Sequence, residues 1–155
     1  MNTDAVTIVI AAWNQLDKTL ECLETVAALT YPNVNTILVD NGSEPPLAPA
    51  ITGRFPAVEV LRLEDNLGFA GGYNAGIRRA LAGGATAILL LNNDTLAAPD
   101  ALDHLVAALD AAPDAGLITA KIYYANEPRR IWTVGANLNV VLDLKDNGQN
   151  EIDAG

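Results

Sequence analysis

The chain has 155 residues, half of them hydrophobic, which is enough for one compact domain with a sizeable core and too few for two. Its net charge of −10 and scattered basic residues exclude the electrostatic footprint of a nucleic-acid-binding protein, so we expect no nucleic-acid partner. A single cysteine and a single histidine argue against a disulfide, a zinc site or a hydrolase triad, and Cys22 is predicted to be a small core residue.

The N-terminal part of the chain alternates strand and helix patterns. Residues 6–10 are an apolar, β-branched run that predicts a strand buried on both faces. Asn14, with an acidic residue three positions later, resembles a capping box and predicts the start of a helix. Residues 35–40 predict a second strand, and the proline-rich stretch 43–56 predicts a loop with one helical turn.

The same alternation continues through the middle of the chain. Residues 58–63 alternate apolar and polar side chains, which predicts a strand nearer the edge of a sheet. A glycine-rich turn follows, and residues 75–81 predict a helix. Residues 87–91 predict another buried strand, and Pro99 is predicted to start an amphipathic helix.

The C-terminal part carries weaker signals. Residues 116–124 and 131–141 are predicted to be strands or extended segments, and the polar stretch 143–155 is expected to fray. Strands that alternate with helices predict an α/β domain of three layers with a largely parallel central sheet. The sequence therefore predicts a Rossmann-like architecture.

Polar or turn-forming residues follow the predicted strands. In parallel sheets, ligands collect just beyond the C-terminal ends of the strands. Four such ends are expected to face one crevice, at residues 11–14, 40–43, 64–66 and 92–94. This is the main argument from the residues alone for a ligand site.

Each of these ends allows a functional and a structural interpretation. Asn92 and Asp94, two residues apart, could hold Mg²⁺ or Mn²⁺ beside a diphosphate, or could simply form a strand-end turn. The glycine-rich stretch 65–76 could let a helix N-terminus approach an anionic ligand, and tight packing explains it equally well. Asp40 could bind a base or a ribose, or cap a turn. No dinucleotide fingerprint or P-loop sequence occurs in the chain.

Taken in order, these segments resemble the family 2 glycosyltransferases of GT-A fold. The resemblance covers roughly residues 5–125 and rests on four motifs, in the segments 8–14, 37–43 and 66–76 and in 90–95 taken together with 99–102. The forms of residues 66–72 and 121–124 look most like the rhamnosyltransferase-like branch. Four modest motifs in register make the resemblance specific.

The resemblance implies a function and a set of roles. It implies binding of a dTDP- or UDP-sugar with a divalent metal, Mn²⁺ or Mg²⁺, for inverting transfer to a hydroxyl of an acceptor glycan or lipid-linked glycan in cell-surface polysaccharide synthesis. The residues that it assigns to the nucleotide sugar are Ala11, Asn14, Asp40, Asn66, Gly68, Asn74, Asn92 and Asn93. The residues that it assigns to the metal are Asp94 and Asn92.

The chain departs from the family pattern at three points. Asn92 replaces the first acidic residue of the D-x-D motif, so we expect metal affinity to rest mainly on Asp94. Tyr73 stands where many relatives carry arginine, which removes a direct phosphate contact. The acidic pair that supplies the general base has no counterpart after Asn126, and we assign no catalytic residue. The carboxylates in that region are Glu127, Asp143, Asp146, Glu151 and Asp153.

The resemblance thus predicts that residues 1–155 form a single donor-binding domain that ends before the acceptor half, with a motif-bearing core at about 5–125 and a polar tail at about 143–155. A missing C-terminal half or a second copy could complete it. The alternatives are a non-catalytic nucleotide-binding or assembly module and, with less support, a nucleotidyltransferase. No targeting or membrane-spanning signal is visible, so we expect a cytoplasmic protein, with peripheral membrane attachment left open.

Overall fold

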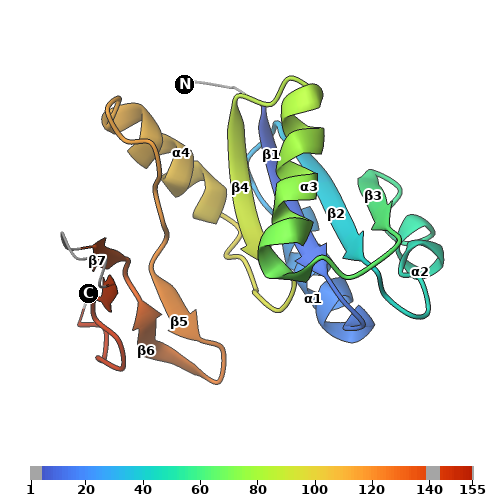
Figure 1. The fold of residues 1–155 in the computed structure, drawn as a ribbon. Coiled ribbons are helices and arrows are strands. Elements are labelled where there is room, and N and C mark those ends of the chain that lie inside the picture. Colours follow the sequence, from blue (N-terminus) through green and yellow to red (C-terminus); the bar gives the residue numbers. More distant parts are fainter. Residues whose placement is uncertain (1–4, 139–143, 155) are drawn as a thin grey trace. The chain divides into compact units, whose positions relative to one another are not determined.

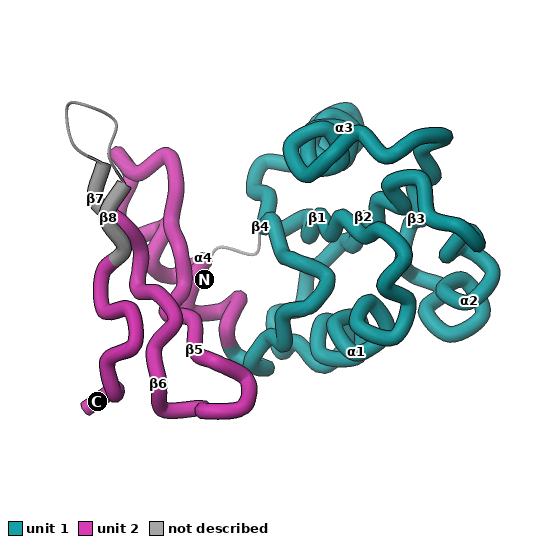
Figure 2. The backbone as a smooth tube through the Cα atoms, turned by 60° about the horizontal axis from the view of Figure 1, so that its bottom comes forward, with its two compact units in different colours: residues 1–100 teal, residues 101–155 magenta. Residues whose placement is uncertain are grey.

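The computed structural model describes residues 5–138 and 144–154, and the chain forms two compact units. The first comprises residues 1–100 and the second residues 101–155 (Figure 2). All four predicted strand ends lie in the first unit. Within the described residues, no helix has the length and apolar character that crossing a membrane requires.

The first unit is built on a four-stranded sheet. Its strands are β1 (Val6–Ala12), β2 (Val34–Asn41), β3 (Val58–Leu63) and β4 (Ala87–Asn92), in the order β3-β2-β1-β4. All three pairings are parallel. The predicted strands are confirmed, with ends that differ by one or two residues.

Helices cover both faces of this sheet. The helices are α1 (Leu16–Ala27), α2 (Ala48–Thr52) and α3 (Gly68–Ala82). Figure 2 shows α3 on one side of the strands and α1 with α2 on the other. The predicted three-layer α/β architecture with a parallel central sheet is therefore confirmed, as is the single helical turn in the loop after β2.

The two faces of the sheet follow the alternation of side chains along each strand. Val9, Ile37 and Val39 lie on the face that α3 covers, where they pack with Tyr73 and Ala80. Because neighbouring residues of a strand point to opposite faces, Asp40 and Asn41 at the end of β2 enter different layers of the protein.

The glycine-rich stretch is a helix, which corrects the predicted turn. Helix α3 begins at Gly68, seven residues before the predicted start. A Cβ atom at Gly76 would lie 2.3 Å from Val9 Cγ1 and 2.9 Å from Val39 Cγ2. Each helical glycine costs about 1 kcal/mol relative to alanine, so the local sequence disfavours a helix here. The close packing of α3 against the sheet stabilises the helix nevertheless.

The predicted capping box at Asn14 is wrong. Helix α1 begins at Leu16, and Gln15 occupies the N-cap without a side-chain hydrogen bond. Asn14 has a left-handed backbone (φ 55°) and bonds the loop after β2 instead. Its backbone N–H donates to Ser43 Oγ (3.0 Å), and its Oδ1 accepts from the N–H of Glu44 (2.7 Å). The side chain therefore joins two loops that are distant in the sequence.

The prediction that residues 87–91 form a buried strand is also corrected. Among the described strands, β4 pairs only with β1 and is an edge of its sheet. Leu90 is 49% exposed as a result. An apolar run does not reveal how many neighbours a strand has.

The second unit contains α4 (Ala101–Ala111), β5 (Ile122–Tyr124), β6 (Glu127–Thr133), β7 (Ala136–Leu138) and β8 (Leu144–Asp146) (Figure 1). The helix starts two residues after the predicted Pro99. Strands β5 and β6 are antiparallel, as are β7 and β8. Part of the predicted segment 131–141 lies outside the described residues.

The expectation that residues 143–155 fray is wrong for the described residues 144–154. The N–H of Ile131 donates to Glu151 O (2.9 Å), and the N–H of Asp153 donates to Arg129 O (2.8 Å). Arg130 and Ile152 form an antiparallel bridge. Backbone pairing with β6 holds the tail, and a polar composition does not exclude such pairing. Asp143 and Gly155 lie outside the described residues.

Candidate functional site

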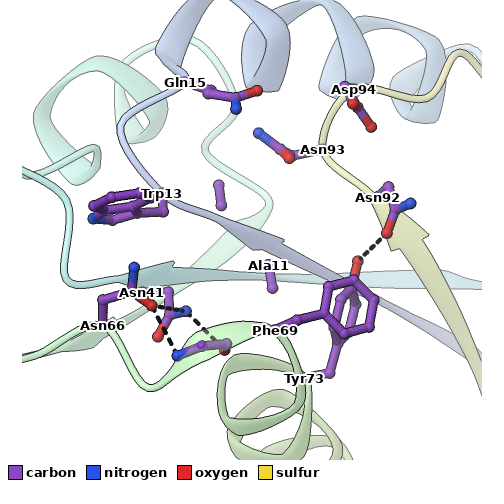
Figure 3. Close-up of a pocket in the computed structure, with 12 residues that line it drawn as sticks. Ala11, Trp13, Gln15, Asn41, Asn66, Phe69, Tyr73, Asn92, Asn93 and Asp94 are labelled. Carbon is purple, nitrogen blue, oxygen red and sulfur yellow. Dashed lines mark hydrogen bonds between the residues drawn. The ribbon is translucent and has the colours of Figure 1, made fainter.

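The first unit has a cavity of about 350 Å³ beyond the C-terminal ends of its strands (Figure 3). Loops after β1, β3 and β4, the end of β2 and the start of α3 line it. The lining residues are Ala11, Ala12, Trp13, Gln15, Asn41, Asn66, Gly68, Phe69, Tyr73, Asn92, Asn93 and Asp94. A concave site of this size at strand ends suits a small ligand.

The structure brings most of the predicted site residues together. Six of them line the cavity: Ala11, Asn66, Gly68, Asn92, Asn93 and Asp94. Three do not. Asn14 joins the β1 and β2 loops, Asn74 is exposed on α3 and is not among the lining residues, and Asp40 is fully buried.

The structure favours the turn-capping interpretation of Asp40 over a contact with a base or ribose, because the side chain is fully buried and does not line the cavity. Its Oδ1 accepts from the N–H of Ser43 (3.0 Å) and its Oδ2 from the N–H of Leu47 (2.9 Å). Arg62, its direct partner on β3, places Nη1 2.8 Å from Oδ2. Burial alone would raise the pKa of Asp40, but hydrogen bonds from the Ser43 side chain and from the N–H groups of Leu47 and Ser43, together with Arg62, outweigh it and lower the pKa. Both oxygens therefore serve the loop after β2.

Asn41 lies on the other face of the sheet, where its side chain bonds the start of α3. It was not among the site residues named from the sequence. Its Oδ1 accepts from the N–H of Leu67 (3.0 Å), and its Nδ2 donates to Asn66 Oδ1 (3.0 Å) and Gly68 O (3.1 Å). Asn66 Oδ1 also accepts from the N–H of Gly68 (2.8 Å). This network fixes the start of α3 against the end of β2. The sequence did contain a signal for this role. Asn41 directly follows Asp40 on a strand, so the two side chains must point to opposite faces of the sheet.

Two exposed aromatic side chains flank the cavity. They lie in the segments 11–14 and 65–76 that the sequence associates with a ligand, but neither was named as a site residue. Trp13 is 52% exposed and Phe69 is 74% exposed. Ligand sites combine apolar and aromatic side chains with a few polar groups, and these two side chains offer the aromatic part of such a lining. Trp13 lies at the end of β1, and the left-handed residue Asn14 directly follows it. The signal available in the sequence was an aromatic residue immediately after a buried strand.

Tyr73 reaches the cavity from α3. The side chain is 5% exposed, and its ring packs against Phe69 with centroids 4.7 Å apart. The hydroxyl donates to Leu91 O and Asn92 Oδ1, each at 2.9 Å. Burial raises the pKa of Tyr73 to about 12, so the hydroxyl remains protonated at neutral pH.

The end of β4 brings three polar residues to the cavity, and they differ in exposure. Asn92 and Asp94 are exposed, whereas Asn93 donates through Nδ2 to Thr19 Oγ1 on α1 (3.1 Å). Beneath them Cys22 is buried, and burial raises its pKa to about 11. Cys22 is therefore a protonated core residue, as predicted.

A divalent metal fits this end of the cavity only as an ion shared with a ligand. Asp94 is the one carboxylate among the residues that line the cavity. Within the described part of the chain, no three His, Cys, Asp or Glu side chains group closely enough to hold a metal. Mg²⁺ and Mn²⁺ are commonly held by one or two side-chain oxygens together with substrate phosphates, and Asp94 can supply one of these.

The carboxylates considered as bases belong to the second unit. Asp153 Oδ2 accepts from Lys121 Nζ (2.8 Å) and from the hydroxyl of Tyr123. Glu127 accepts from Arg130 Nε (2.7 Å). Asp143 and the side chain of Asp146 lie outside the described part of the structure. We still assign no catalytic base.

Comparison with known proteins gives a consistent picture. A family model described as Glycosyl transferase family 2 matches residues 7–152. The succinoglycan biosynthesis protein ExoO of Rhizobium meliloti (strain 1021) is 34% identical over 110 residues, which are 69% of this chain and 30% of that protein. The chain thus spans about a third of the length of this relative.

Solved structures of low sequence identity share the fold. S. aureus TarS 1–349 aligns with a TM-score of 0.59 and 19% identity over 70% of this chain and 33% of that chain. The mannosyltransferase PcManGT from Pyrobaculum calidifontis, in complex with GDP-Man and Mn²⁺, aligns with a TM-score of 0.61 and 20% identity over 77% of this chain and 35% of that chain. TarS 1–349 in complex with UDP-GlcNAc aligns with a TM-score of 0.60 at 15% identity over 79% of this chain and 41% of that chain.

Proposed function

Because the chain belongs to glycosyltransferase family 2, we propose that the cavity of its first unit binds the nucleoside diphosphate of a sugar donor together with a divalent metal. The observation that carries this proposal is a single cavity lined by an exposed Trp13, the start of α3 and Asp94. These three features match the base, the phosphates and the metal of one ligand. Residues 1–155, with both compact units, then form one donor-binding domain.

The cavity offers a different chemistry at each end. Trp13 presents an aromatic face on which a nucleobase can stack. The N-terminal N–H groups of α3 favour phosphate groups, and Asn41 and Asn66 hold that helix end in place. A metal bound at Asp94 would neutralise the charge that develops on the leaving diphosphate. The chain's own residues bind and orient the donor in this scheme.

The relatives support the choice of ligand. The PcManGT structure contains GDP-Man and Mn²⁺, and the TarS structure contains UDP-GlcNAc. The ExoO protein belongs to succinoglycan biosynthesis. We therefore propose a nucleotide sugar as donor, an acceptor glycan, and a role in polysaccharide synthesis. The sequence resemblance adds the choice of a UDP- or dTDP-sugar and a transfer that inverts the anomeric centre.

Asp94→Ala is the direct test of the metal end of the cavity. In the wild type, Mn²⁺ should strengthen binding of UDP, dTDP or GDP, and the preferred nucleotide should raise the melting temperature most. Loss of the single carboxylate should remove this metal-dependent gain, a decrease in affinity of about ten- to a hundredfold. Isothermal titration calorimetry with and without Mn²⁺ measures both quantities.

The matched control is Asp17→Ala, which removes an exposed carboxylate of α1 that does not line the cavity. This variant should keep the metal-dependent gain. If Asp94→Ala binds the nucleotide with the same dependence on Mn²⁺ as the wild type, the metal assignment is wrong.

Trp13→Ala tests the base end of the cavity. Stacking of a base on an aromatic side chain is worth about 1–3 kcal/mol, so the affinity for the nucleoside diphosphate should fall roughly ten- to a hundredfold. Binding of inorganic pyrophosphate, which has no base, should change little. Trp132→Ala is the control, because Trp132 is 43% exposed and lies in the second unit. Equal losses for nucleotide and pyrophosphate would show that Trp13 does not contact the base.

A further inference from the structure

Tyr73 joins the core of the first unit to the cavity. Its ring belongs to the cluster formed by Val9, Val39 and their neighbours between α3 and the sheet. Only its hydroxyl reaches the end of β4, where it lies 2.9 Å from both Leu91 O and Asn92 Oδ1 (Figure 3). A buried hydroxyl in such a position requires partners, and these two oxygens share its single hydrogen.

The groups around the Tyr73 hydroxyl are held in place, with the exception of the Asn92 side chain. Leu91 O belongs to the backbone of β4, which pairs with β1. The Tyr73 ring is held by the core and by its contact with Phe69. Of the groups in this hydrogen-bonded set, the exposed Asn92 side chain is the one that can rotate. Tyr73 therefore determines how the carboxamide of Asn92 is oriented.

The two ends of a carboxamide have opposite chemistry. Its oxygen accepts hydrogen bonds and binds cations, whereas its NH₂ group donates hydrogen bonds and cannot bind a cation. In the structure, Oδ1 of Asn92 faces the Tyr73 hydroxyl. Among the residues that the structure describes, Nδ2 of Asn92 has no hydrogen-bond partner. A phosphate oxygen is the ligand group that suits an unpaired donor beside Asp94.

We propose that Tyr73 is a positioning residue that holds Oδ1 of Asn92, so that Asn92 donates a hydrogen bond through Nδ2 to the diphosphate and does not bind the metal. This inference rests on the proposed nucleotide function and changes the role first predicted for Asn92. Asp94 is then the side chain that binds the metal. Asn92 contributes equally to nucleotide binding whether or not a metal is present.

The test measures the dissociation constant of UDP, or of dTDP or GDP if one binds better, by calorimetry in EDTA and in Mn²⁺. The ratio of the two constants is the metal effect. Asn92→Ala should weaken binding about tenfold in both conditions and leave the metal effect unchanged. Tyr73→Phe should weaken binding in the same pattern by a smaller factor, with little further loss in the double variant, because both changes remove one interaction.

Asn92→Asp is the third variant. Its carboxylate should accept the hydrogen bond of Tyr73 and present a second oxygen to the cavity. Binding in EDTA should become weaker through repulsion of the phosphates, and the metal effect should increase. A thermal unfolding curve recorded for each variant shows that binding is compared between folded proteins.

Two results would overturn the inference. If Asn92→Ala abolishes the metal effect while binding in EDTA stays at the wild-type level, Asn92 is a metal ligand, and the proposed nucleotide function stands without this inference. If Tyr73→Phe binds like the wild type in both conditions, Tyr73 does not position Asn92. Failure of the wild type to bind any of the three nucleotides, in EDTA or in Mn²⁺, would refute the proposed function itself and this inference with it.

Discussion

Asp40→Ala is expected to lower the free energy of unfolding by about 3 kcal/mol, because it removes the anion at the centre of a buried network. The carboxylate accepts from the N–H groups of Ser43 and Leu47 and forms an ion pair with Arg62. After the substitution two loop N–H groups lose their acceptor, and the partly buried guanidinium loses its counter-ion. Total stabilities are about 5–15 kcal/mol, so this loss should be readily visible in urea denaturation.

The effect of this substitution should depend on pH. The hydrogen bonds and Arg62 outweigh burial and lower the pKa of Asp40 in the folded protein below the ordinary value of an aspartate. A lowered pKa stabilises the folded state at every pH above the unfolded value, and this contribution is lost as pH falls towards the folded value. The difference between wild type and Asp40→Ala should therefore be largest near neutral pH and should shrink below about pH 4.

Asp17→Ala again serves as the control, because this exposed carboxylate should contribute little to stability at either pH. Asp40→Ala is compared with it by circular dichroism in urea at pH 7 and at about pH 3, below the ordinary pKa of an aspartate. Equal midpoints for the two variants at pH 7 would show that the network around Asp40 contributes no net stability.

Gly76→Ala is expected to destabilise the first unit although it replaces glycine with the best helix former. The new Cβ would lie 2.3 Å from Val9 Cγ1 and 2.9 Å from Val39 Cγ2, and both valines are fully buried. Overpacking usually costs about 1–3 kcal/mol, and a clash this short should reach the upper end of that range. The helix propensity of alanine offsets only about 1 kcal/mol. We expect the melting temperature to fall by several degrees.

The matched control is Gly53→Ala at the end of α2. No atom lies within 4 Å of a Cβ placed there, and the backbone has φ −70°. This variant should unfold at the wild-type temperature or slightly above it. If Gly76→Ala has the same melting temperature as Gly53→Ala, helix α3 can move away from the sheet without a cost in stability. Because α3 also carries Gly68, Phe69 and Tyr73, Gly76→Ala should in addition weaken nucleotide binding.

The sequence alone was sufficient for the strands of the sheet, their parallel direction and the place of the site. Each strand is a short apolar run whose local period is visible without any tertiary information. The parallel order follows from strands that alternate with helices, and parallel strands end at the same edge of a sheet. For this reason residues as distant as Ala11, Asn66 and Asp94 could be expected in one cavity, and the structure places them there.

The tertiary structure decided which residue at each strand end faces the cavity. Asp40 and Asn41 are neighbours with similar polar side chains, yet one is enclosed by the loop before α2 and the other holds the start of α3. The choice depends on which helix covers which face, and no local pattern contains that information. The same holds for the glycines of α3, where packing against Val9 and Val39 overrides a composition that favours a turn. Local periodicity specifies a strand or a helix, but only contacts between distant segments determine the direction and the partner of each polar side chain.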